Sequence, residues 1–217
     1  MSLFQALVAA LIASFTLPAH AQGYRPDVIE MDGSVPMVFA PDAALTISNG
    51  GTIEFWTQPD WEDDPGFDPV ILSNTGEVGA SYVIAMLADR SGIAVLSGEQ
   101  EQVFTADFGD GQMHHVALNQ FDGSMIVLVD GRAVGETPFT MQDLPSDGLW
   151  VGSLDGETNP YLGAIGQLRF WDYVPAFKTL MIYATRDVVV DEHPQLEFLS
   201  AMSDFNTDTL LILEAME

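Results

Sequence analysis

Hydrophobic residues along most of this chain alternate with polar residues over short stretches, and clusters of Gly, Asp, Asn and Pro separate these stretches. A strand with one buried face shows this period of two, because successive side chains point to opposite faces of the sheet. The stretches recur at intervals of about ten residues, which is typical of a sandwich of antiparallel sheets. The predicted strands are Ile29–Met31, Val38–Phe39, Leu45–Ile47, Thr52–Gln58, Val70–Ser73, Tyr82–Leu87, Ile93–Ser97, Val103–Asp107, His114–Gln120, Met125–Val129, Arg132–Glu136, Leu149–Val151 and Tyr161–Trp171.

The clearest unit of this pattern is the segment His114–Glu136. Val116 and Leu118 fall on one face of its first strand, and polar residues fall mostly on the other. The dipeptides Asp122-Gly123 and Asp130-Gly131 predict tight turns, because a two-residue hairpin loop requires positive φ at both central positions. The segment therefore predicts a three-stranded meander.

The C-terminal part of the chain gives weaker signals. Phe177–Thr185 is the one plausible short helix, and Val188–Val190, Leu196–Leu199 and Leu210–Leu213 resemble closing strands. No stretch rich in Pro, Gly and Ser divides the chain, and no internal repeat is visible. We therefore expect residues 22–217 to form a single all-β domain.

The first 21 residues contain no charged side chain. The largely apolar stretch Leu3–Leu17 is followed by Pro18 and by Ala19-His20-Ala21, whose small residues suit cleavage after Ala21 by a signal peptidase. The stretch is shorter than the roughly 20 residues that a membrane-spanning helix needs. We therefore expect residues 1–21 to be a cleavable signal peptide and the mature chain, without a membrane span, to be periplasmic or extracellular.

Charge then narrows the choice of function. The chain has 32 Asp plus Glu against 6 Lys plus Arg, a net charge of −26, and 47% of its residues are hydrophobic. Such a hydrophobic content excludes a disordered acidic tail, and the lack of a basic surface argues against nucleic acid and anionic membranes as partners. The chain has no Cys, which excludes thiol catalysis, thiolate zinc sites and disulfides.

Five segments of the chain form a recognisable series. They are Met31–Ser34 (MDGS), Thr52–Pro59 (TIEFWTQP), Asp110–Leu118 (DGQMHHVAL), Val127–Gly131 (VLVDG) and Gly163–Trp171 (GAIGQLRFW). In this order they resemble the laminin G-like jelly rolls of the concanavalin A-like superfamily. Met113 replaces the Trp that is usual in the third segment, and the chain from about residue 176 is only loosely similar. The resemblance implies an antiparallel β-sandwich of the jelly-roll type.

The resemblance also implies a non-catalytic module that binds a glycan or glycoconjugate, with calcium as an optional cofactor. One alternative is a structural or adhesive domain that binds a protein of the cell envelope or extracellular space. A second alternative is an endo-acting glycoside hydrolase, since the superfamily contains retaining enzymes with the pattern E-x-D-x-x-E. The nearest match, Glu30–Val35, lacks the third carboxylate, and Glu54 is alone on its strand. We therefore expect no catalytic residues.

Two acidic loops are candidates for calcium binding. Asp60–Asp68 holds five carboxylates and two aromatic residues within nine positions, and Asp155–Tyr161 is a second acidic loop. Calcium takes about six to eight oxygen ligands, which irregular acidic loops can supply. The expected ligands are Asp63, Asp64, Asp68 and Asp155. The alternative is a set of solvated turns that keeps the protein soluble.

Three aromatic residues lie outside the alternating core pattern, within these same loops. They are Trp61, Phe67 and Tyr161. Exposed aromatic faces stack on sugar rings and anchor protein partners, so we expect these three residues to contact a ligand. Phe55, Trp56 and Trp171 lie within predicted strands and are expected in the core.

Overall fold

The computed structural model describes residues 26–34, 37–184 and 196–200 of the 217-residue chain. The predicted signal peptide, residues 1–21, lies outside these described residues. The same holds for two of the predicted closing strands, Val188–Val190 and Leu210–Leu213. Within the described ranges, no helix has both the length and the apolar character needed to cross a bilayer.

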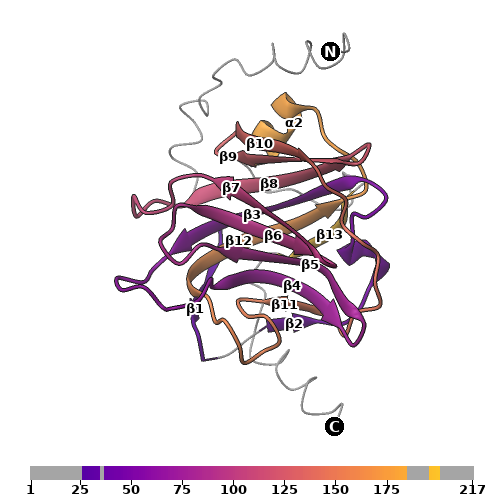
Figure 1. Cartoon of the computed structure of the whole chain (residues 1–217). Helices are drawn as coiled ribbons and strands as arrows, with labels where there is room; N and C mark the ends of the chain where they lie inside the picture. Colours follow the sequence, from indigo (N-terminus) through magenta and orange to yellow (C-terminus); the bar gives the residue numbers. More distant parts are fainter. Residues whose placement is uncertain (1–25, 35–36, 185–195, 201–217) are drawn as a thin grey trace.

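Two antiparallel sheets pack face to face, which confirms the predicted all-β sandwich (Figure 1). The first sheet has the order β1 (Val28–Asp32), β12 (Leu162–Trp171), β3 (Gly51–Pro59), β8 (His114–Phe121), β9 (Ser124–Val129) and β10 (Arg132–Pro138), and β13 (Leu196–Ser200) also pairs with β12. The second sheet has the order β2 (Met37–Phe39), β11 (Leu149–Val151), β4 (Val70–Gly76), β5 (Gly79–Met86), β6 (Gly92–Ser97) and β7 (Gln100–Thr105).

Most of the predicted strands are present, with two corrections. The predicted strand Leu45–Ile47 is not a strand, because Leu45 ends a 3-10 helix, η2 (Ala43–Leu45), which begins where Asp42 Oδ1 accepts a hydrogen bond from Ala44 N at 2.8 Å. The predicted strand Val103–Asp107 starts and ends earlier, as β7. It ends before Asp107 because that side chain accepts a hydrogen bond from Gly109 N at 2.9 Å and forms a turn.

The predicted meander is confirmed as β8, β9 and β10. Asp122 and Gly123 have φ values of 50° and 75°, and Asp130 and Gly131 have φ values of 48° and 71°, as the two tight turns require. Val116 on β8 is fully buried in the core, while the next residue along the strand faces the outer side.

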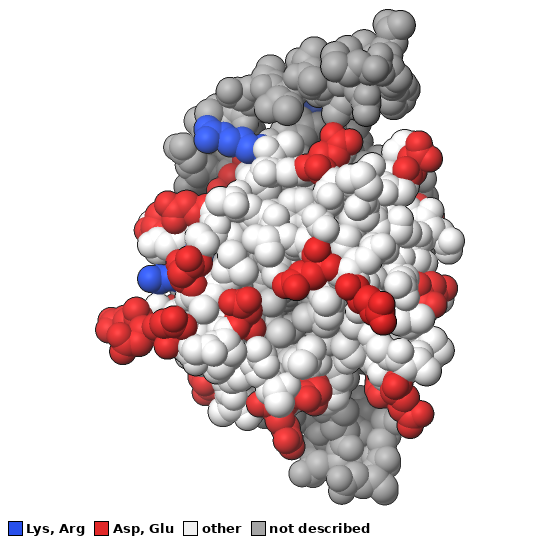
Figure 2. All heavy atoms as spheres, in the orientation of Figure 1, with Lys and Arg blue, Asp and Glu red and all other residues white. Residues whose placement is uncertain are grey.

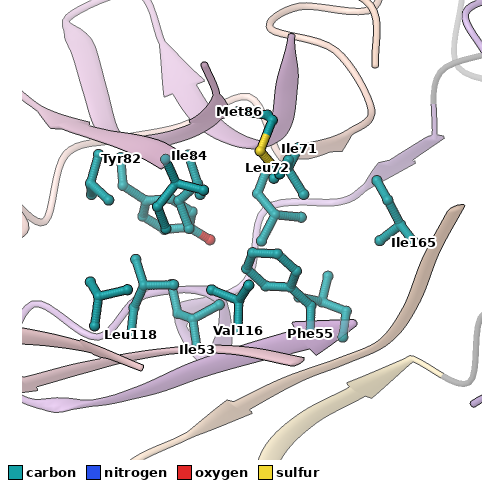
Figure 3. Close-up of a cluster of buried hydrophobic side chains, with 14 of the residues drawn as sticks. Ile53, Phe55, Ile71, Leu72, Tyr82, Ile84, Met86, Val116, Leu118 and Ile165 are labelled. Carbon is teal, nitrogen blue, oxygen red and sulfur yellow. The ribbon is translucent and has the colours of Figure 1, made fainter. Parts of the chain in front are cut away.

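The hydrophobic core lies between the two sheets (Figure 3). Ile53 and Phe55 of β3 meet side chains of the opposite sheet such as Tyr82 and Ile84, and all four are fully buried. Each such side chain contributes on the order of 1.5–3 kcal/mol when it leaves water.

The outer face of the first sheet is buried as well. Trp56 is 4% exposed and Trp171 is 1% exposed, so the prediction that they are core residues holds, but on the face away from Phe55. Helix α2 (Phe177–Tyr183), which confirms the predicted short helix, covers part of this face. Its residue Leu180 packs there with Ala117 of β8. Both faces of the first sheet are therefore buried, which limits where a ligand can bind.

The loops of the sandwich gather at two opposite ends, because neighbouring strands run antiparallel. One end carries the segments 60–69, 87–91, 106–113 and 152–161, which we call the acidic rim. The other end carries η2 and the segment 139–147, which links β10 of the first sheet to β11 of the second. We call this segment the strap. Both ends are open to solvent, and the candidate sites lie there.

Candidate functional site

The acidic rim is held together by hydrogen bonds between its loops. Trp61 Nε1 donates to Ala88 O at 2.9 Å, and Asp68 Oδ1 accepts from Ala88 N at 2.8 Å. Asn159 Nδ2 donates to Asp68 O at 3.1 Å, so the two acidic loops identified in the sequence lie side by side. On the molecular face in Figure 2, Asp and Glu side chains are widespread and Lys and Arg side chains are few.

Two of the three expected ligand-binding aromatic residues are in the core. Tyr161 is fully buried and Trp61 is 7% exposed, and their rings meet edge to face at a centroid distance of 5.7 Å. Tyr161 Oη lies 2.6 Å from Thr57 Oγ1, so its polar end is satisfied inside the protein. The expectation that these two rings face a ligand is therefore corrected, because loop position does not outweigh the gain from burying a large aromatic side chain. Phe67, at 37% exposed, keeps an accessible face.

The four expected calcium ligands are not brought together. Asp64 Oδ1 accepts from Gly66 N at 2.8 Å, and Asp63 is exposed. Asp155 Oδ1 accepts from Thr158 N at 2.8 Å and from Glu157 N at 3.1 Å, and these hydrogen bonds lower the pKa of Asp155.

These carboxylates stabilise their own turns, in the way that Asp commonly does. No group of three His, Asp or Glu side chains among the described residues is arranged to hold a metal ion. Calcium binding by Asp63, Asp64, Asp68 and Asp155 therefore stays a prediction.

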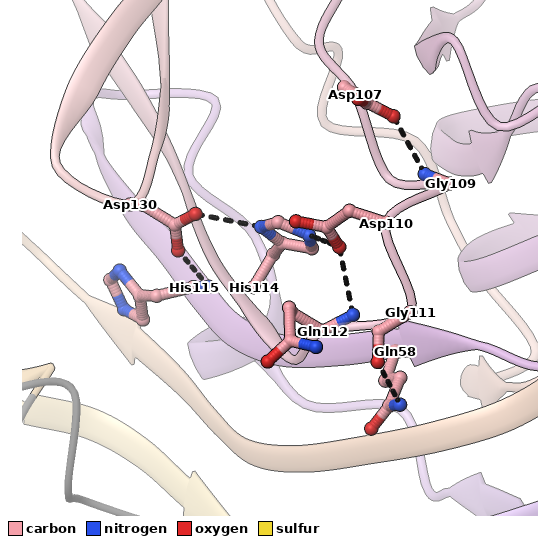
Figure 4. A network of polar contacts seen from close by, with 9 residues as sticks. All are labelled: Gln58, Asp107, Gly109, Asp110, Gly111, Gln112, His114, His115 and Asp130. Atoms are coloured by element: carbon pink, nitrogen blue, oxygen red, sulfur yellow. Dashed lines mark hydrogen bonds and ion pairs between the residues drawn. The ribbon is translucent and has the colours of Figure 1, made fainter.

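A second feature of the rim is a histidine held between two carboxylates (Figure 4). His114 Nδ1 lies 2.7 Å from Asp130 Oδ2, and His114 Nε2 lies 3.0 Å from Asp110 Oδ1. Burial favours the neutral ring, but the hydrogen bonds and negative charges of Asp130 and Asp110 outweigh it and raise the pKa of His114. The network fixes the segment 106–113 to the turn between β9 and β10.

The neighbouring histidine belongs to a different network, as the strand alternation predicts. His115 Nε2 lies 3.1 Å from Glu54 Oε2 on the outer face of the first sheet. Glu54 Oε1 accepts from Arg169 Nη1 at 3.1 Å and from Trp171 Nε1 at 2.9 Å. Burial disfavours the charged carboxylate, but the positive charge of Arg169 and the interaction with His115 outweigh it and lower the pKa of Glu54 to about 2.

The Glu54 network was missed in the sequence, where Glu54 is a lone carboxylate. Arg169 is 115 residues away in the chain, yet it lies directly opposite Glu54 in the pairing of β3 with β12. The available signal was the alternation of β3, which places Glu54 on the face opposite Ile53 and Phe55. This network is fully buried, so it contributes to the fold and is not accessible to a ligand.

The strap at the other end is fixed to the second sheet by two buried serines. Ser81 Oγ donates to Leu144 O at 2.9 Å and accepts from Leu144 N at 3.0 Å. Ser97 Oγ accepts from Gln142 N at 2.7 Å and donates to Ser81 O at 2.6 Å. Because alternate backbone groups of the strap are held in this way, its position is defined before any ligand binds.

Two hollows flank Leu144 of the strap. The larger has a volume of about 590 Å³, and its wall includes Val78, Glu99, Gln100 and Gln142. The smaller has a volume of about 250 Å³, and its wall includes Asp42, Thr46, Asn74, Ser81, Asp143 and Ser146. Carboxylate, amide and hydroxyl groups next to an apolar side chain are the surroundings that a polar organic ligand requires. No pattern in the sequence indicated these hollows, because their residues come from distant segments.

The described geometry defines a class of protein: an antiparallel lectin-like sandwich with polar hollows at one end. Residues 32–176 match the laminin G-type family model of the concanavalin A-like lectin/glucanases superfamily. The chain therefore belongs to this superfamily, which confirms the resemblance seen in its sequence. No curated protein sequence matches the chain.

Solved structures share the fold at low sequence identity. A Bacteroides ovatus protein described as carbohydrate-binding has a TM-score of 0.65 at 16% identity, over 84% of this chain and 53% of that chain. This chain thus spans about half the length of that protein. The CBM40 module of a Ruminococcus gnavus sialidase, bound to α2,3-sialyllactose, has a TM-score of 0.54 at 13% identity, over 73% and 96% of the two chains. The LG1–3 region of the laminin α2 chain has a TM-score of 0.51 at 16% identity, over 68% and 27%.

Proposed function

We propose that this protein is an exported, non-catalytic module that binds a glycan through the hollows beside the strap. The observation that carries the proposal is a pair of hollows with polar walls whose backbone is fixed by Ser81 and Ser97. The proposal is supported by the superfamily and by two structural neighbours, one described as carbohydrate-binding and one bound to sialyllactose.

The state of the carboxyl groups supports binding rather than hydrolysis. A glycosidase general acid needs a raised pKa so that it carries a proton at working pH. Among the described residues, the carboxyl groups whose pKa departs from its ordinary value, Glu54 and Asp155 among them, have a lowered pKa. Glu54 is also fully buried and cannot reach a glycosidic bond.

The test is binding of the purified protein to a panel of oligosaccharides and polysaccharides, in calcium and again in EDTA. We expect binding of at least one glycan that survives EDTA, because the expected calcium ligands hold their own turns. Release of reducing ends from any glycan would contradict the non-catalytic assignment. If no glycan on the panel binds, the glycan assignment is contradicted and the adhesive alternative is favoured. In that alternative a protein partner co-purifies in stoichiometric amount.

Export is a separate part of the proposal. It is supported by the apolar stretch Leu3–Leu17 and the Ala19-His20-Ala21 sequence that follows it. Cell fractionation with N-terminal sequencing tests it, and the expected mature N-terminus is Gln22. Recovery of the intact N-terminus in the cytoplasm would refute this part alone.

A further inference from the structure

We propose that the smaller hollow is a subsite for one uncharged sugar ring and that it excludes acidic sugars such as sialic acid. The inference rests on the proposed glycan-binding function and adds to it a location and a ligand class. It follows from the size of the hollow, from the polar groups in its wall, and from the charge of the residues around it.

The size of the hollow suits a single sugar ring. Its volume is about 250 Å³, which is below the range of about 300–1,000 Å³ typical of sites for drug-sized ligands. The same volume is far more than a bare metal ion fills. The larger hollow begins on the other side of Leu144, so an oligosaccharide can continue across the strap.

The wall contains a buried amide with an unused acceptor. Asn74 is 4% exposed, and its Nδ2 donates to Leu45 O at 3.0 Å. Its Oδ1 is buried and has no hydrogen-bond partner in the part of the chain that the structure describes. A buried carbonyl without a donor is unfavourable, but this oxygen is shielded from the hollow. The wall groups that a sugar hydroxyl can reach are the exposed Asp42 and Asp143 and the partly exposed Thr46 and Ser146.

The wall is also rigid before a ligand arrives. Tyr82 Oη donates to Leu45 O at 2.9 Å, so two buried side chains fix the end of η2. Asp42 caps η2 at its other end through Ala44 N, and Ser81 fixes Leu144. A site whose walls are already ordered loses less conformational entropy on binding.

The charge of the wall selects against acidic ligands. Asp42 and Asp143 both line the hollow, and none of the described residues that line it is Lys, Arg or His. Carboxylates accept charge-assisted hydrogen bonds from the hydroxyls of a neutral sugar, but they repel the carboxylate of sialic acid. The net charge of −26 adds a long-range repulsion of the same sign. This chain has the same fold as a module that binds sialyllactose, but we do not expect it to bind the same ligand.

The test uses substitutions paired with matched controls. Ala43→Trp fills the hollow from an exposed position of η2, and Ala133→Trp places the same side chain at an exposed position of β10. Asp143→Asn removes a wall carboxylate, and Asp147→Asn removes an exposed carboxylate that does not line the hollow. The second pair changes the net charge equally, so it separates a local contact from general electrostatics.

The probes are lactose, cellotriose and arabinotriose as neutral sugars, α2,3-sialyllactose as the acidic counterpart of lactose, and calcium chloride alone, each followed by calorimetry. We expect at least one neutral sugar to bind. Ala43→Trp and Asp143→Asn should weaken that binding by about tenfold or more, and both controls should leave it within about twofold. Sialyllactose should bind more weakly than lactose, or not at all.

Each contrary result has its own meaning. Neutral-sugar binding that Ala43→Trp and Asp143→Asn leave unchanged would overturn the subsite while leaving the glycan-binding function intact. Tighter binding of sialyllactose than of the neutral sugars would overturn the charge selection. Binding of calcium alone that Asp143→Asn abolishes would make the hollow a cation site and overturn the inference. Failure of every sugar to bind would overturn the proposed function and the subsite together.

Discussion

Glu54→Gln is the most informative test of what holds this fold together. The substitution keeps the size of the side chain but removes the carboxylate that faces Arg169, His115 and Trp171. The three contacts measure 3.1, 3.1 and 2.9 Å, and the side chains of Glu54 and Arg169 are 0% and 1% exposed. The neutral amide leaves positive charge at a site with little access to water. Loss of one partner from a buried ion pair costs about 3–5 kcal/mol.

The pKa of Glu54 gives an independent estimate of the same loss. The pKa falls from its ordinary 4.5 to about 2 in the folded protein, which corresponds to roughly 3 kcal/mol of stabilisation of the ionised form. Because the folded pKa is lowered, this stabilisation is fully present above pH 4.5 and is lost as the pH falls toward 2.

The assay is chemical denaturation of wild type, Glu54→Gln and Glu101→Gln at pH 7 and at pH 3. Glu101 is exposed on β7, so Glu101→Gln loses the same charge without breaking a buried network, and should change the free energy of unfolding by less than about 0.5 kcal/mol. Glu54→Gln should lose about 3 kcal/mol or more at pH 7 and less at pH 3. A loss below about 1 kcal/mol at pH 7, or one that is equal at both pH values, would refute this reasoning.

Three further predictions concern the rim. The pKa of His114 is raised in the folded protein, so the stabilisation that its ion pair with Asp130 gives is fully present below the unfolded pKa and is lost as the pH rises through the folded pKa. Asp130→Asn should therefore destabilise the protein more at pH 6 than at pH 9. An equal effect at both pH values would contradict the ion pair. In urea denaturation, Trp61→Ala should lower the free energy of unfolding by about 3–5 kcal/mol and Tyr161→Phe by about 1–2 kcal/mol. Phe67→Ala should change it by less than about 0.5 kcal/mol, because Phe67 is exposed. A large loss for Phe67→Ala alone would contradict this order of burial. EDTA should leave the Tm within about 1 °C in thermal denaturation, and a clear fall would reveal a stabilising metal.

The strands were predictable because alternation is a local property of the sequence. Val116 and Leu118 of β8 mark the core face, and Asp-Gly dipeptides mark the turns on both sides of β9, so a short stretch of sequence contains the whole signal. The segment around Leu45 departs from its predicted strand because the same local pattern fits two structures. Its hydrophobic residues are buried as expected, but Asp42 starts a 3-10 turn there, and burial alone does not distinguish a turn from a strand.

The sites were less predictable, because they depend on contacts between distant segments. Trp61 and Tyr161 lie in acidic loops, yet each has a partner for its polar atom within the fold, Ala88 O for one and Thr57 Oγ1 for the other. Those partners made burial favourable, and nothing near Trp61 or Tyr161 in the sequence shows that they exist. The smaller hollow likewise needs Asp42, Asn74 and Asp143, which only the packing of the strap brings together.

The acidity of the chain and the absence of a preformed metal site among the described residues are physically consistent. At the rim, Asp64, Asp68 and Asp155 each use one oxygen to accept backbone hydrogen bonds, so these carboxylates stabilise the local structure of the loops. The one described carboxylate that is fully buried, Glu54, faces Arg169 on the neighbouring strand. The other carboxylates whose exposure the structure describes are partly or fully exposed, so salt screens their mutual repulsion. This negative surface charge also repels an acidic ligand that approaches, so we expect the protein to prefer a neutral glycan to an acidic one.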